Sequence, residues 1–384
     1  MHLKPYSASM SFRAFFALLT AICLSACVPE QPSGKLDASN ASVQVALLVP
    51  YGSEDPSEAS LASDMENAAR LAIADISGVK IDIRVYDTNG NALDARSAAL
   101  KAAEDGADII VGPLHAESAN AVAVAVAPRR INVLAFSNNE TIAGGNLYIM
   151  GQTFYDTANR LVEYAVEQGK SRILIVHSNT LSGRLGRDAI EKAIADNGAY
   201  SVGSVGHDFS QQGVIDSIPE IKAAVEKTAA DTVFLTATST GGLPLFSQML
   251  PEAGLGNDMV QHIGLTRWDR PPRTLDLPGI EGGWFAMPDQ VRDALFKAKF
   301  NEATGTNPHT LAGLSYDAIS AIGALAISGR TGALTQPAGF QGVTGIFRFR
   351  SNRTIERGLS VATVEDRMIV ELSPAPQSFG GTGF

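Results

Sequence analysis

Cysteine and charge are both scarce in this 384-residue sequence. It contains two cysteines, Cys23 and Cys27, and only 18% of its residues are charged. The 30 lysines and arginines are outnumbered by 40 aspartates and glutamates, which gives a net charge of -10. This balance argues against a nucleic-acid partner, because binding to phosphates requires clustered lysines and arginines. Hydrophobic residues make up 45% of the chain, enough for a large core, and the length suits two domains.

Recognisable catalytic motifs are also missing. There is no P-loop and no G-x-G-x-x-G after a predicted strand, and the serines within 201–206 lack the spacing of a nucleophile elbow. The histidines beyond the N-terminal segment are scattered, with no H-E-x-x-H pair or partner cysteine that would indicate a metal site. These histidines are His115, His177, His207, His262 and His309. We therefore predict a protein that is not an enzyme and uses neither a metal nor a cofactor.

The N-terminus has the composition of a targeting segment. Lys4 and Arg13 precede the apolar run 14–26, which is short for a membrane span of about 20 residues and suits a signal peptide. The run closes with Leu-Ser-Ala-Cys at 24–27, which resembles the lipobox of bacterial lipoproteins. The resemblance implies a signal peptide over 1–26 and lipidation of Cys27. The alternative is an ordinary signal peptide followed by a chance cysteine.

Lipidation would make membrane attachment the role of Cys27. Cys23 would leave with the signal peptide, so an exported fold without a disulfide would be held by its core alone. Residue 28 is Val rather than Asp, which, by resemblance to lipoproteins of enteric bacteria, favours the periplasmic face of the outer membrane over the inner membrane. Residues 27–42 are mostly polar and without a period, and we predict that they form a tether.

From residue 43 onward, predicted strands and helices alternate. The run Asp108 to Leu114 holds an apolar Ile-Ile-Val segment that exits through Gly112 and Pro113, as expected of a buried parallel strand. This alternation predicts an α/β fold with parallel sheets, and it starts again after Gly151, which indicates two similar lobes. The predicted strands before the last third are 43–50, 81–86, 108–112, 131–136, 172–177, 200–205, 232–237 and 261–265.

The last third begins with a predicted strand at 280–287 and does not start another lobe. Two consecutive helices are predicted at 291–304 and 310–328, and a β tail follows at 345–372. The end of the chain, 373–384, is rich in proline and glycine, and we predict that it is disordered.

The order of these features resembles the type I periplasmic binding proteins, the leucine/isoleucine/valine-binding family. The resemblance covers 43–372 and is carried by the starts and ends of strands, by Tyr316-Asp317-Ala318 in the late helix and by the segment 343–349. It implies two Rossmann-like lobes joined by hinge crossovers. The implied first lobe is 43–150 plus 286–332, and the implied second lobe is 151–285 plus 333–372.

Within that family, the lipobox, residues 135–139, residues 264–269 and the Thr-Gly…Phe-Arg-Phe pattern of the tail most resemble the penicillin-binding protein activators, which are lipoproteins. This resemblance implies a non-catalytic protein that docks on a penicillin-binding protein, a peptidoglycan synthase, and activates it. The alternative is a substrate-binding lipoprotein that delivers an amino acid or a similar small solute to an ABC permease.

Polar side chains just past the strand ends are the candidates for a ligand-binding cleft, because open parallel sheets bind ligands there. They are His115, Ser118, Ser137, Asn138, Asn139, His177, Asn179, Ser182, Thr238, Ser239 and Trp268. For each serine and asparagine the alternative is helix capping or turn formation. In the amino-acid-binding members a hydroxyl-rich loop holds the ligand; Ser118 matches it, but Glu117 within that loop would repel a carboxylate.

Overall fold

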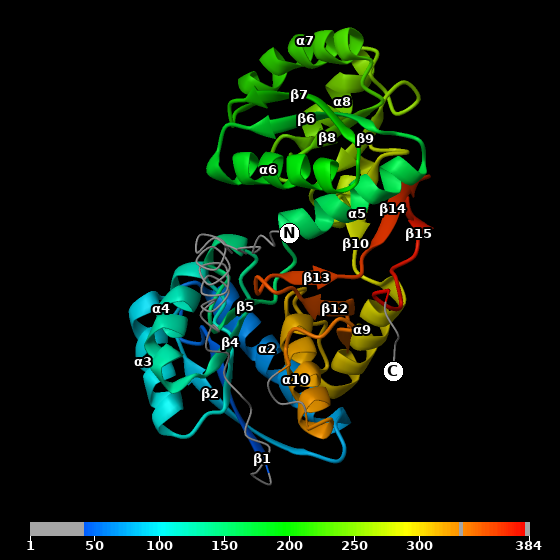
Figure 1. The fold of residues 1–384 in the computed structure, drawn as a ribbon. Helices are drawn as coiled ribbons and strands as arrows, with labels where there is room; N and C mark the ends of the chain where they lie inside the picture. Colours follow the sequence, from blue (N-terminus) through cyan, green and yellow to red (C-terminus); the bar gives the residue numbers. More distant parts are fainter. Residues whose placement is uncertain (1–41, 330–332, 381–384) are drawn as a thin grey trace, which may run out of the picture. The chain divides into compact units, whose positions relative to one another are not determined.

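A computed structural model describes residues 42–329 and 333–380 of the protein (Figure 1). The predicted signal peptide, the proposed lipidation site Cys27 and almost all of the tether lie outside these residues, as do the last four residues of the chain. The described chain forms two α/β lobes, each built on a mainly parallel sheet, and a separate three-stranded sheet. The predicted fold class is confirmed.

The first lobe is built on a parallel five-stranded sheet with helices on both faces (Figure 1). Its strands, in spatial order, are β2 (Lys80–Asp87), β1 (Ser42–Val49), β3 (Ile109–Val111), β4 (Asn132–Ala135) and β5 (Leu147–Ile149). Its helices are α2 (Pro56–Asp75), α3 (Ala92–Glu104), α4 (Ala116–Val126), α9 (Gln290–Thr304) and α10 (Ala312–Ile327). Alternate residues of β1 enter two cores: Val45 and Leu47 pack with α2 and α10, whereas Ala46 and Leu48 pack with α3 and α4.

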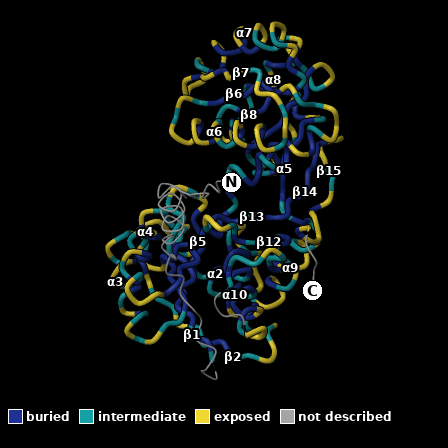
Figure 2. Tube along the Cα trace, viewed as in Figure 1, coloured by how far each residue is buried: buried dark blue, intermediate teal, exposed yellow. Residues whose placement is uncertain are grey.

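The second lobe is built on a seven-stranded sheet whose buried strands stand out in the burial-coloured trace (Figure 2). Its spatial order is β15 (Met368–Ser373), β14 (Ser360–Glu365), β10 (Trp284–Met287), β9 (Gln261–Gly264), β8 (Thr232–Leu235), β6 (Arg172–Ser178) and β7 (Tyr200–His207). Its helices are α5 (Phe154–Glu167), α6 (Leu181–Asp196), α7 (Gln211–Thr228) and α8 (Leu243–Glu252). Helices α5 and α6 pack on one face, and α7 and α8 on the other. Strands β14 and β15 are antiparallel additions to the parallel set.

The three-stranded sheet packs differently from its predicted assignment. It consists of β11 (Phe340–Gly342), β12 (Gly345–Phe349) and β13 (Ile355–Arg357). The family resemblance places 333–372 in the second lobe, but Phe340, Phe347, Phe349 and Ile355 belong to the same core cluster as β1 and α10. Aromatic burial therefore attaches this sheet to the first lobe, and only β14 and β15 join the second. We propose that the first lobe extends to Arg357.

The described part of the C-terminal tail is held by packing. The sequence predicts disorder from residue 373, yet Ala375 and Phe379 are buried. The guanidinium of Arg348 lies over the Phe379 ring, 4.5 Å from its centroid. These contacts contradict the prediction for residues 373–380, because two apolar side chains among the prolines and glycines are enough to fasten the segment.

A buried polar network ties segments on which the chain passes from one lobe to the other. The Arg357 guanidinium donates to the Asp317 carboxylate at 2.8 Å, to the Thr344 hydroxyl at 2.7 Å and to the Met150 carbonyl at 3.1 Å. Its backbone N–H donates to the Asp156 carboxylate at 2.8 Å. The Asp317 side chain is fully buried, so its charge depends on this pair for compensation.

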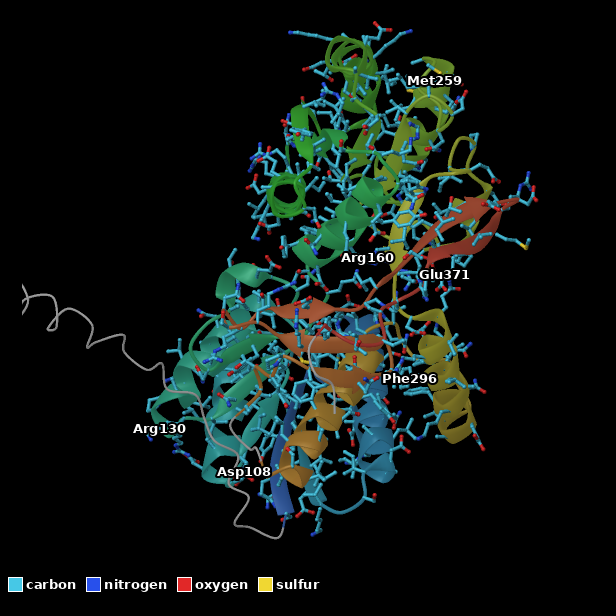
Figure 3. All side chains as sticks on the ribbon, turned by 45° about the vertical axis from the view of Figure 1, so that its right-hand side comes forward. Asp108, Arg130, Arg160, Met259, Phe296 and Glu371 are labelled. Atoms are coloured by element: carbon cyan, nitrogen blue, oxygen red, sulfur yellow. The ribbon has the colours of Figure 1, made fainter. Side chains whose placement is uncertain are left out.

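A second arginine reinforces the same region from helix α5. Arg160, labelled in Figure 3, donates from Nε to the Leu359 carbonyl at 2.9 Å and from Nη2 to the Ser373 hydroxyl at 2.5 Å. It therefore joins α5 to the chain entering β14 and to the end of β15.

The N-terminus of helix α3 is capped by the side chain of Asn91, and this cap can be tested by substitution. The side-chain oxygen of Asn91 accepts from the N–H groups of Leu93 at 3.1 Å and Asp94 at 3.0 Å, which caps the helix. We expect Asn91→Ala to lower the free energy of unfolding by about 1 kcal/mol, because two N–H groups lose their partner. Urea denaturation measures this. The exposed Arg96→Ala in the same helix should change stability by less than about 0.5 kcal/mol; an equal loss in both variants would contradict the capping role.

Candidate functional site

The loops after β4 and β6 form the clearest cavity at the carboxyl ends of the sheets. Its volume is about 330 Å³. It is lined by Asn138, Asn139, Glu140, Thr141, Phe154, Leu181, Ser182, Leu185 and Ala189. Three predicted site residues, Asn138, Asn139 and Ser182, are therefore brought together, as the rule for open α/β sheets leads one to expect.

Local hydrogen bonds shape the polar side of this cavity. The Ser137 hydroxyl accepts from the Asn139 N–H at 3.1 Å, and the Asn139 side-chain oxygen accepts from Thr141 N–H at 3.0 Å and from its hydroxyl at 2.8 Å. Asn139 thereby caps the short 3-10 helix that begins at Glu140. Asn138 is exposed and lies on the cavity wall.

The opposite side of the cavity is apolar. Leu181 and Leu185 lie one turn apart on α6, and 67% of Leu181 is exposed. Phe154, the first residue of α5, and Ala189 complete this wall. Leu93, Leu181 and Leu295 are all more than half exposed, but of these three only Leu181 lines this cavity. An apolar wall on a concave surface is typical of a site that contacts a ligand.

The cavity carries one ionisable side chain, that of Glu140. Its Oε1 atom is buried and has no hydrogen-bond partner. An unpaired buried carboxylate oxygen is costly, so it marks a position where a donor from outside the chain would be stabilising.

Several predicted residues lie outside this cavity. His115 precedes α4 and pairs with Glu58, with 2.9 Å between its Nε2 and the carboxylate. Ser118 is buried in the first turn of α4, so its hydroxyl does not line the cavity. His177 is buried at the end of β6, with its Nδ1 3.1 Å from the Ser178 carbonyl.

The remaining predicted residues come from the loops after β6, β8 and β9. The Asn179 amide donates to Asp208 at 3.2 Å, and the Ser239 hydroxyl donates to the Arg270 carbonyl; Thr238 is exposed nearby in the chain. Trp268 is only 1% exposed and stacks on Phe285, with 6.2 Å between ring centroids. Its predicted place in the ligand cleft is wrong, because the ring is part of the core of the second lobe.

Six of the nine lining residues are not among the predicted site residues: Glu140, Thr141, Phe154, Leu181, Leu185 and Ala189. Glu140 directly follows Asn139 and belongs to the same loop after β4, so its position after a strand end is the signal that identifies it. Leu185 belongs to the apolar stripe of helix α6, and the spacing of that stripe predicts that Leu185 is buried. In the structure Leu185 is 38% exposed. Periodicity alone cannot separate a core-facing stripe from one that faces a cavity.

A larger cavity of about 600 Å³ lies elsewhere, beside edge strand β2 and helix α2. Gln44, Ile81 and Arg84 are among its lining residues. They lie in the amino-terminal part of β1 and in the first and middle parts of β2, away from the carboxyl ends where ligands of open α/β sheets bind. We therefore place the candidate site at the smaller cavity.

Metal-ligand clusters and membrane-spanning helices are two further features that bear on function. Within residues 42–329 and 333–380, no three His, Cys, Asp or Glu side chains are grouped so that they could hold a metal ion. None of the helices in this part of the chain combines the length and the apolar character needed to cross a membrane.

Comparison with known proteins identifies the family. The family model described as "Periplasmic binding protein" matches residues 42–367, so the chain belongs to the periplasmic binding protein family. Membership implies a periplasmic location, and the fold is typically non-catalytic. No curated protein sequence matches the chain.

Solved structures share the fold at low sequence identity. A putative branched-chain amino acid ABC transporter protein from Rhodospirillum rubrum is 17% identical, with a TM-score of 0.72 over 86% of this chain and 100% of that one. A branched-chain amino acid ABC transporter periplasmic ligand-binding protein from Burkholderia xenovorans is 17% identical, with a TM-score of 0.65 over 88% and 97%. A substrate-binding protein from Desulfitobacterium hafniense in complex with Leu is 18% identical, with a TM-score of 0.62 over 86% and 100%.

Proposed function

We propose that this protein binds a small organic solute in the cavity between the 138–141 loop and α6 and presents it to an ABC importer. The observation that carries the proposal is the cavity itself, in which an apolar wall faces a few polar side chains at the carboxyl ends of strands. This combination is typical of small-molecule sites. The solved structures of similar fold support the proposal, since their descriptions name ABC transporter proteins.

A thermal-shift screen tests solute binding. It would use amino acids, aromatic acids, aliphatic amines and cell-wall fragments as probes. A probe present at 100 times its Kd should stabilise the protein by about 2.7 kcal/mol, which gives a readable shift. No response from any probe would contradict the proposal.

The variant Leu185→Trp should abolish the response to whichever probe binds. The larger indole would occupy space in a cavity of about 330 Å³ that the solute needs. We expect at least about a hundredfold loss of affinity, equivalent to about 2.7 kcal/mol, measured by isothermal titration calorimetry. Leu93→Trp is the matched control, because Leu93 is 79% exposed on α3 and does not line the cavity. Unchanged binding in the Leu185 variant would place the solute elsewhere.

A second candidate function is docking on a penicillin-binding protein and activation of that peptidoglycan synthase. It is favoured by the resemblances at 135–139 and 264–269 and by the lipobox that ends at Cys27. The two functions differ in location, because an importer's binding protein must reach the inner membrane. Cell fractionation discriminates between them: outer-membrane protein that co-purifies with a synthase supports activation, and protein confined to the inner membrane supports transport.

A further inference from the structure

The charge of the candidate cavity narrows the class of solute. Its lining holds one carboxylate, Glu140, and no lysine, arginine or histidine among the described residues. Cations on the adjoining helix α6 are engaged elsewhere: the Arg184 guanidinium donates to the Asn179 carbonyl, and Arg187 pairs with Asp188. A solute carboxylate would therefore meet a negative charge without a compensating positive one, which is unfavourable at short range.

The buried oxygen of Glu140 adds a requirement for a donor. Oε1 is shielded from solvent and lacks a hydrogen-bond partner. An ammonium group supplies N–H donors and the opposite charge, and such charge-assisted hydrogen bonds are about twice as strong as neutral ones. The facing wall of Leu181, Leu185 and Phe154 suits an aliphatic or aromatic body.

We propose that the cavity selects a cationic amine with an apolar body and no carboxylate. The Glu140 carboxylate holds the ammonium, and the leucine and phenylalanine side chains bury the hydrocarbon. The inference rests on the proposed solute-binding function and names the substrate class of that same site.

Three probes that share the isobutyl side chain of leucine test the proposal. They are 3-methylbutan-1-amine, which is a cation, 4-methylpentanoate, which is an anion, and leucine, which carries both charges. Isothermal titration calorimetry at neutral pH should show binding of the amine at least about tenfold tighter than that of leucine, and no binding of the carboxylate. Equal or tighter binding of leucine, or any binding of 4-methylpentanoate, would overturn the proposal.

The variant Glu140→Gln should weaken amine binding by about 10- to 100-fold, the usual worth of a hydrogen bond to a charged group. Glu163→Gln on α5 is the matched control, because its half-exposed carboxylate pairs with Arg160 outside the cavity. Unchanged amine affinity in the Glu140 variant overturns the proposal. If the amine does not bind, but another probe does and Leu185→Trp abolishes that binding, the proposed preference for amines is wrong and the proposed solute-binding function stands. If no probe binds, both the preference for amines and the solute-binding function are contradicted.

Discussion

Replacement of Asp156 by asparagine is expected to stabilise the protein above neutral pH and to leave its stability unchanged near pH 4. Asp156 is 4% exposed near the start of α5, with 3.6 Å between its carboxylate and the Arg350 guanidinium. Burial raises its pKa to about 7, against the opposing effects of Arg350 and of the Arg357 backbone and guanidinium. The nearby Glu356 carboxylate adds to the rise in this pKa.

The direction of the pH dependence follows from the protonation of Asp156 in the folded and the unfolded chain. Below about pH 4 the carboxyl is protonated in the folded and the unfolded chain, so it contributes nothing. Between about pH 4 and pH 7 the unfolded chain releases this proton while the folded chain keeps it, so stability declines as pH rises. The accumulated cost at pH 7 and above is on the order of 4 kcal/mol, for a shift of about three pKa units at about 1.36 kcal/mol each.

Urea denaturation from pH 4 to pH 8 measures this difference between the variant and the wild type. The side-chain amide introduced by Asp156→Asn keeps an oxygen that can accept from the Arg357 N–H, so the backbone contact survives the substitution. Asp188→Asn on α6, an exposed carboxylate, is the control and should change stability by less than about 1 kcal/mol at every pH. If the free energies of unfolding of the wild type and the variant differ by the same amount at every pH from 4 to 8, Asp156 is not the group whose protonation changes the stability.

Replacement of Arg357 by methionine should lower the free energy of unfolding by about 3–5 kcal/mol. The substitution leaves the Asp317 carboxylate buried without its cation, and breaking a buried pair in this way is strongly destabilising. The Thr344 hydroxyl and the Met150 carbonyl lose a donor as well. Urea denaturation with circular dichroism measures the loss.

Two further variants separate charge from packing at this position. The double variant Arg357→Met with Asp317→Leu removes both charges and should recover part of the lost stability. Arg348→Met, in the neighbouring strand, breaks a pair with Glu356 whose side chains are 28% and 25% exposed, compared with 3% and 0% for Arg357 and Asp317, and should cost clearly less, about 1 kcal/mol. If Arg348→Met costs as much as Arg357→Met, burial of the Asp317 pair is not the cause.

The alternation of strands and helices could be read from the sequence because each parallel strand is a short apolar run bounded by turn residues. The run around Ile109 to Val111 illustrates this: it is buried on both faces and ends at Gly112, where an added Cβ would clash with the Leu48 carbonyl. Strand β5 was missed, since its three residues carry no period and follow a loop. The family resemblance implies that the three-stranded sheet belongs to the second lobe, whereas we propose that it belongs to the first, because its phenylalanines pack with β1 and α10.

The candidate site could be predicted only in part. Position after a strand end identifies Asn138 and Asn139, since parallel strands place their carboxyl ends along one edge. The same rule also selected Trp268, but the side chain of Trp268 packs in the core of the second lobe. Which polar side chain stays unpaired, as Glu140 Oε1 does, depends on neighbours distant in sequence and cannot be read from one chain segment.

The two lobes alternate along the chain, and this order has a consequence for folding. The core around Leu47 requires α10 and the phenylalanines of β11 and β12, which come long after the first sheet in the chain. During synthesis most strands of the second sheet are therefore made before α10, while the face of β1 that carries Val45 and Leu47 has only α2 to cover it. A chain in this state exposes apolar surface and is prone to aggregation. Completion of the first lobe becomes the late, long-range step of folding.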